Sequence, residues 1–157
     1  MTRAQLTQKI EDHYGAAAEY VFRDEPDICV FRHAGNRKWF AIMMKVSGLS
    51  LGLRNPAPLD IVNFKSDPMY IGSMLGEPGF YPAYHMNKTH WITAVLESDG
   101  TGGRAATAEH GATAGSGAAE RKALGSMACA ADEDILMLLD QSFELTAVKA
   151  GPKRKSV

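Results

Sequence analysis

The fold of this 157-residue chain is decided by the stretch from Ile28 to Val46, which reads ICVFRHAGNRKWFAIMMKV. Both arms are rich in β-branched, aromatic and other apolar residues, which favour strands. Between them lies Gly35-Asn36, two residue types that tolerate the positive φ of a tight turn. The stretch therefore predicts an antiparallel hairpin. Alternation divides its second arm into a core face and a mixed face: Phe40, Ile42, Met44 and Val46 against Arg37, Trp39, Ala41, Met43 and Lys45.

Three helices are predicted outside the hairpin. Thr2 and Gln5 have the spacing of a capping box, and Gly15 ends the helix that they begin. Asp67-Pro68 supplies an N-cap and a first-turn proline for a short helix that ends near Gly76. The clearest helix, over 132–145, has an acidic first turn that the helix dipole favours. Its predicted buried stripe consists of Ile135, Leu138, Leu139, Ser142 and Phe143.

The order of elements predicts the fold class. Further strands are expected over 20–23, 59–65, 81–86 and 90–96, which gives helix, three or four strands, helix, two strands, helix. Short connections favour antiparallel pairing, and the helices are too few to cover two faces. We therefore expect a single domain over 1–157, a two-layer α+β sandwich with its antiparallel sheet covered by helices on one face.

Two segments differ in composition from this domain. Residues 98–131 hold 7 Gly and 11 Ala among 34 residues, which leaves few large side chains to offset the entropy of ordering them. We expect a flexible surface insertion there. Residues 149–157 form a basic tail that we expect to be frayed.

Composition limits the classes of protein that the chain can represent. Its 17 Lys and Arg nearly balance 18 Asp and Glu, so a polyanion partner must be met by a local patch. Two cysteines make no disulfide framework. No apolar run has the length of a membrane span, and the N-terminus lacks the pattern of a signal peptide. We expect a cytoplasmic, monomeric protein without a membrane partner.

Positive charge gathers in the strand-rich half. Residues 28–96 hold seven Lys and Arg against three Asp and Glu, a local net charge of +4. Two predicted hairpin tips, 33–38 and 85–90, combine cations or imidazoles with amides, and a tryptophan follows each tip. Aromatic stacking beside cations is the chemistry of nucleic-acid binding. The alternative is that both tryptophans are partly buried and the cations form a solvated rim.

No pattern of catalysis or of metal binding is found. His33, His85 and His90 could meet, but the sequence has no Cys pair and no His-x-x-x-His spacing. Cys29 lies in an apolar strand, where a thiol behaves as a small hydrophobe. Phosphate-loop and nucleophile-elbow motifs are missing. We expect a protein that is not an enzyme, with no catalytic residue, metal or cofactor.

One block, Pro82-Ala-Tyr-His-Met-Asn-Lys-Thr-His-Trp91, is specific enough to indicate a family. Together with Val30–Arg32, Lys38–Ala41, Asn63–Pro68 and Leu138–Leu145 it resembles the MmcQ/YjbR family. The resemblance covers Thr2 to about Lys155 apart from the Gly/Ala-rich insertion. It implies a CyaY-like (frataxin-like) or secretion-chaperone-like fold, and a DNA-binding role through two hairpin "wings".

The resemblance and the charges together give a set of candidate DNA-binding residues. We expect phosphate contacts from the wings, with the tryptophans available for stacking. The candidates are Arg32, Asn36, Arg37, Lys38, Trp39, Lys45, Lys65, His85, Asn87, Lys88 and Trp91. Two alternatives stay open. One is a protein or peptide adaptor that uses a sheet face with Trp39, Met43 and Tyr84, and the other a small-ligand pocket lined by His33, Tyr84, His85 and Trp91.

Overall fold

The computed structural model describes residues 1–99 and 128–148. The chain begins with α1 (Arg3–Tyr14), and the predicted capping box is confirmed: the Thr2 side chain accepts from Gln5 N while the Gln5 side chain accepts from Thr2 N. Gly15 ends the helix in the left-handed conformation, at φ 63°. A non-glycine residue there would be strained, so the sequence marks both ends of this helix correctly.

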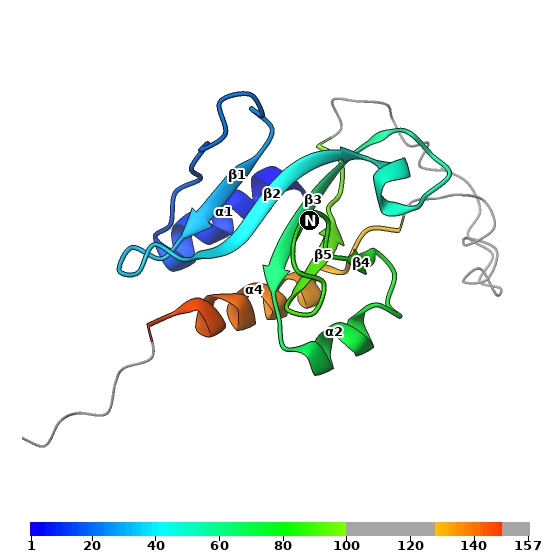
Figure 1. Ribbon diagram of the computed structural model, residues 1–157. Coiled ribbons are helices and arrows are strands. Elements are labelled where there is room, and N and C mark those ends of the chain that lie inside the picture. The colour runs from blue at the N-terminus through cyan, green and yellow to red at the C-terminus, as the bar shows by residue number, and fades with distance from the viewer. Residues whose placement is uncertain (100–127, 149–157) are drawn as a thin grey trace, which may run out of the picture.

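The sheet has five antiparallel strands in the order β1-β2-β3-β5-β4 within the described residues (Figure 1). The hairpin predicted first is confirmed as its first two strands, and β2 is the longest strand. The strands are β1 (Cys29–Arg32), β2 (Trp39–Ser47), β3 (Pro58–Lys65), β4 (Phe80–Pro82) and β5 (Trp91–Val95).

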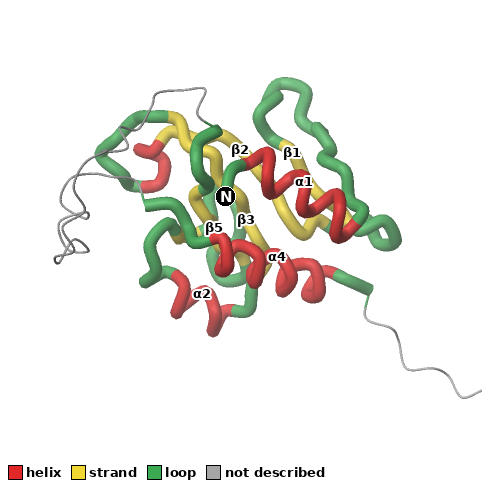
Figure 2. The backbone as a smooth tube through the Cα atoms, turned by 180° about the vertical axis from the view of Figure 1, so that it is seen from behind, coloured by secondary structure: helices red, strands yellow, loops and turns green. Residues whose placement is uncertain are grey.

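The helices gather on one face of the sheet. Figure 2 shows α1 and α4 (Asp132–Thr146) in front of the strands, seen from behind the view of Figure 1. The short α2 (Pro68–Met74) follows β3 and is capped by Asp67, as predicted. Together these elements confirm the α+β fold class. A single 3-10 turn, η1 (Gly48–Leu51), follows β2.

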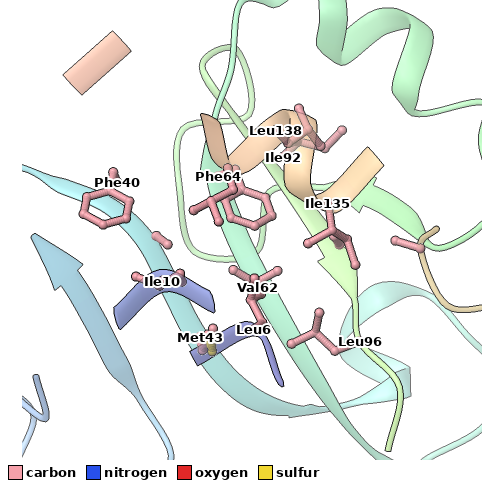
Figure 3. Close-up of a cluster of buried hydrophobic side chains, with 14 of the residues drawn as sticks. Leu6, Ile10, Phe40, Met43, Val62, Phe64, Ile92, Leu96, Ile135 and Leu138 are labelled. Carbon is pink, nitrogen blue, oxygen red and sulfur yellow. The ribbon is translucent and has the colours of Figure 1, made fainter. Parts of the chain in front are cut away.

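The main core lies between the sheet and the helices. In Figure 3, Leu6 and Ile10 of α1 and Ile135 and Leu138 of α4 point toward side chains of the sheet. All four are fully buried, which confirms the predicted burial of Ile135 and Leu138. Burial of a side chain of this kind stabilises the fold by about 1.5–3 kcal/mol.

A second cluster covers the other face, and it corrects the predicted core face of β2. Ile42, Met44 and Val46 pack there, away from the helices, whereas Ala41 and Met43 face α1 and α4. Phe40 also lies on the helix side, because the pairing of β1 with β2 shifts at Phe31 and Arg32 and leaves Phe40 as an extra residue. A bulge of this kind changes the parity of the strand, so strict alternation fails at this point. The face with the second cluster is called the open face below.

Other expectations need correction or fall outside the described residues. Residues 20–23 form no strand; the preceding residue, Glu19, makes an isolated bridge to Val30. The strand expected over 81–86 is confined to β4. Most of the insertion, 100–127, and the basic tail, 149–157, lie outside the described residues. Among the helices that are described, none has the length and apolarity to cross a membrane.

Candidate nucleic-acid interface

Both predicted hairpin tips lie at the same end of the sheet. The first tip joins Arg32 to Trp39, which pair across β1 and β2. The second leads directly into Trp91, the first residue of β5, which pairs with Lys65, the last residue of β3. Since β2 and β3 are antiparallel, Trp39 and Lys65 belong to the same end. We call this end of the sheet the tip end.

The tip end carries a row of alternating cations and indoles on the open face. Arg32, Trp39, Lys65 and Trp91 come from the consecutive strands β1, β2, β3 and β5. Both tryptophans pack against the second cluster and are half-buried. With strands about 4.8 Å apart, the two indoles are separated by roughly 10 Å across the sheet. We call these four residues the tryptophan row.

Helix α4 fixes the first tip. The His33 ring Nε2 lies 2.9 Å from the carbonyl oxygen of Phe143 and 2.8 Å from the Thr146 hydroxyl. Asn36 donates from Nδ2 to the Thr146 carbonyl at 2.7 Å, and its Oδ1 accepts from Lys38 N at 2.9 Å. Asn36 was predicted as a DNA-binding residue, and in the structure its side chain stabilises the tip. These bonds hold the tip in one position beside the end of α4.

Two arginines of the interface share one carboxylate. Arg37 Nη2 donates to both oxygens of Glu19, each at 3.0 Å, and Arg32 Nε lies 3.3 Å from Glu19 Oε2. The Arg32 guanidinium also lies over the Trp39 ring, 5.6 Å from its centroid. Sequence reasoning missed Glu19, because its partners are 13 and 18 residues away and only the strand pairing brings them together.

The three lysines of the tip end are free of ion pairs with the described residues. Lys38 and Lys88 are exposed at the two tips, and Lys65 lies half-buried between the tryptophans. None of them forms a salt bridge within residues 1–99 and 128–148. Their charge is therefore available to an anionic partner.

Lys45 does not belong to this group. It lies near the other end of β2, six residues beyond Trp39, and shares the helix-side face with Ala41 and Met43. Six residues of strand span about 20 Å. The structure thus brings together ten of the eleven candidate residues and leaves Lys45 apart, opposite Asp60 of β3.

A buried polar pair holds the segment before β5 on the open face. Asn63 of β3 donates from Nδ2 to the Tyr84 carbonyl at 3.1 Å, and Tyr84 N donates to Thr93 Oγ1 at 2.9 Å. The Thr93 hydroxyl in turn donates to Asn63 Oδ1, and both side chains are fully buried. The next residue, His85, is exposed with a positive φ of 56°. Tyr84 and His85 are thus presented by strands β3 and β5 rather than by a free loop.

The second tip has its own internal bonds. Asn87 Oδ1 accepts from Thr89 N at 2.8 Å, and the Asn87 carbonyl accepts from Trp91 N at 2.9 Å. This turn sets the start of β5 and places Lys88 at its exposed corner. Asn87 therefore shapes the turn while Lys88 carries the charge.

An open cleft of about 440 Å³ lies beside this segment. Its lining includes Leu51, Tyr81, Tyr84, His85 and Lys88. Burial raises the pKa of the Tyr81 phenol, and the nearby Cys129 thiol adds to the effect. The phenol is therefore neutral at physiological pH.

The structure does not bring together all the residues of either alternative site, the small-ligand pocket or the sheet face of an adaptor. His33 is buried against α4 on the helix side, so it cannot line a pocket with Tyr84 and His85. Met43 is fully buried under the helices, so it is not available on an exposed sheet face. Among the described residues, no group of three or more His, Cys, Asp or Glu side chains has an arrangement that could hold a metal ion.

The chain is similar in sequence to known proteins. The model of the YjbR family matches residues 12–145. Among curated proteins, the chain is 33% identical over 97 residues to the uncharacterized protein YyaQ of Bacillus subtilis (strain 168). The alignment covers 62% of this chain and 82% of YyaQ.

Solved structures with similar folds include the following two. A crystal structure of a Pseudomonas syringae protein matches with a TM-score of 0.72 and 28% identity, over 94% of this chain and 100% of that one. The Deinococcus radiodurans protein DR2400, which carries the family-model domain DUF419, matches with a TM-score of 0.57 over 97% of this chain and 83% of its own. At 19% identity the second likeness concerns the fold alone.

Proposed function

This chain belongs to the YjbR family, and we propose that it is a non-enzymatic DNA-binding protein whose contact surface is the tip end of the sheet. One observation carries the proposal. Arg32, Trp39, Lys65 and Trp91 form a single row on the open face, and Lys38 and Lys88 stand at the tips on either side. In the proposed complex the cations contact phosphates, and bases stack on the indoles that lie between the cations.

The lysines supply affinity that depends on salt. Each phosphate that a Lys or Arg neutralises releases counterions from the strand. If Lys38, Lys65 and Lys88 contact three phosphates of a single strand, log K falls with log salt at a slope of about −2. The overall charge of −1 does not oppose this, because the cations are local.

The tryptophans favour a single strand over a duplex. Both rings are fixed by packing against the second cluster, so little side-chain entropy is lost on binding. Stacking on such a ring contributes about 1–3 kcal/mol per base and requires an unpaired base. A duplex would offer only its phosphates to the lysines. We therefore expect tighter binding to single-stranded DNA.

The experiment titrates the protein into a labelled single strand of DNA of about 20 nucleotides, and separately into its duplex. Binding is measured by fluorescence anisotropy at two salt concentrations. We expect the single strand to bind more tightly, to quench tryptophan fluorescence, and to lose affinity as salt rises. Trp91→Leu should weaken binding of the single strand and leave binding of the duplex nearly unchanged. An affinity that does not change with salt concentration, or no binding of either DNA, would refute the proposal.

A further inference from the structure

We infer that Glu19 occupies a phosphate site formed by Arg32 and Arg37, and that a phosphate group of the ligand displaces its carboxylate. The inference deepens the proposed function and rests on it for the identity of the ligand. Its starting point is a mismatch: two guanidinium groups converge on a single, half-buried carboxylate. One positive charge at this point therefore remains uncompensated by Glu19.

The hydrogen bonds of Glu19 leave one donor unused. Both of its oxygens accept from Arg37 Nη2, at 3.0 Å each. Arg32 Nε is a buried nitrogen that has no hydrogen-bond partner among the described residues, although Glu19 Oε2 is 3.3 Å away. A buried donor without a partner costs about 1–3 kcal/mol. A phosphate offers more acceptor oxygens than a carboxylate and could satisfy both arginines together.

Both guanidinium groups are held in position before any ligand arrives. Arg32 lies over the Trp39 ring, 5.6 Å from its centroid, which holds its guanidinium group beside the indole. Arg37 adopts a φ of 62°, and its backbone N donates to the His33 carbonyl at 3.0 Å. A left-handed non-glycine residue persists only where its surroundings enforce it. Here the enforcement comes from the tip, which His33 and Asn36 tie to α4.

Glu19 can leave the arginines without unfolding the domain. Its backbone is anchored to the outer edge of β1 by two bonds with Val30, both of 2.9 Å. Its side chain is 33% exposed, so the ion pair is partly screened by water. Pairs of this kind contribute only about 0–1 kcal/mol. Rotation of the side chain would therefore suffice to open the site.

Phe22, three residues further on, covers the other half of the same surface. Its ring lies edge-on to Trp39 with a centroid distance of 6.2 Å, and it is itself 41% exposed. The segment from Glu19 to Phe22 thus places a carboxylate on the arginines and an aromatic ring on the indole. These are the positions in which the proposed function requires a phosphate and a base.

The test compares Glu19→Gln with Glu25→Gln, a matched loss of one negative charge from the same segment before β1. Glu25 forms no salt bridge with the described residues. Glu19→Gln should bind the labelled single strand roughly two- to five-fold more tightly than wild type. Glu25→Gln should stay near the wild-type affinity.

A second readout uses inorganic phosphate alone. The ¹H–¹⁵N signals of the Arg32 and Arg37 Nε–H groups should shift saturably, at lower phosphate concentration in Glu19→Gln than in Glu25→Gln. If wild type binds DNA and both variants bind it equally, the inference is wrong and the proposed function stands. If no variant binds DNA while phosphate still moves these signals as described, the proposed function fails and the phosphate site stands. If phosphate does not shift these signals in either variant, the inference is wrong.

Discussion

Ser142 joins α4 to two strands with one hydroxyl group. Its Oγ donates to the Phe40 carbonyl and accepts from Lys65 N at 2.9 Å, and the residue is fully buried. Helical periodicity predicted that Ser142 would be buried, but not its partners. Phe40 offers its carbonyl to the helix at the irregular end of the β1–β2 pairing, and no local pattern in the sequence marks that irregularity.

Ser142→Ala should destabilise the domain by about 1–3 kcal/mol, because a buried carbonyl and a buried N–H both lose their partner. Urea unfolding measures the change. The control is Ser73→Ala on the exposed face of α2, where the hydroxyl donates only to the Tyr70 carbonyl of its own helix. Equal losses in the two variants would contradict the role assigned to Ser142.

Cys29 gives the stability a pH dependence. Burial raises the pKa of its thiol above the ordinary value of 9.0, although the neighbouring Arg3 guanidinium opposes the shift. The unfolded chain therefore releases this proton at a lower pH than the folded one. The resulting stabilisation is complete below the unfolded pKa and is lost as the pH rises toward the folded pKa.

Between about pH 8 and pH 10 the unfolding free energy of wild type should fall more steeply than that of Cys29→Ala. Denaturant unfolding across this range measures both slopes. The alanine variant loses some packing at every pH, which lowers its unfolding free energy throughout. The comparison therefore uses the change of the unfolding free energy with pH and not its absolute value. Parallel curves would show that this thiol does not titrate differently on folding.

At the scale of elements, the helices were easier to predict than the strands. Capping residues such as Thr2 and Asp67 act locally, so their effect is visible in the sequence. The sheet is apolar on both faces, so alternation along β2 could not distinguish the helix side from the open face. Only the three-dimensional pairing reveals that Phe40 is an extra residue.

The bonds of Asn63 and Thr93 determine where the segment before β5 lies. Thr93→Val keeps the shape of the side chain but removes the acceptor of Tyr84 N and the donor to Asn63. We expect a loss of about 1–3 kcal/mol and faster hydrogen exchange at the Tyr84 amide. Thr89→Val, in the exposed turn, is the matched control. Unchanged exchange at Tyr84 would argue against this anchoring.

At the scale of the whole molecule, the candidate interface was predictable in composition but not in shape. The sequence identified its lysines, arginines and tryptophans, but it did not show that Arg32 would lie over the Trp39 ring. It could not exclude Lys45, whose distance from the tips depends on the length of β2. Nor could it identify Glu19, whose contact with Arg32 and Arg37 arises from a bridge outside the named strands.

In the proposed function, the position of the cations, and not the total charge, determines DNA binding. Two double variants with the same net charge separate these effects: Lys38→Glu with Lys88→Glu at the tip end, and Lys9→Glu with Arg54→Glu elsewhere. All four residues are exposed, and none forms a salt bridge with the described residues. The measurement is the dissociation constant for a single strand at low salt, by fluorescence anisotropy. We expect a loss of at least about ten-fold in the tip variant and a far smaller loss in the other; equal losses in both would refute the proposed function.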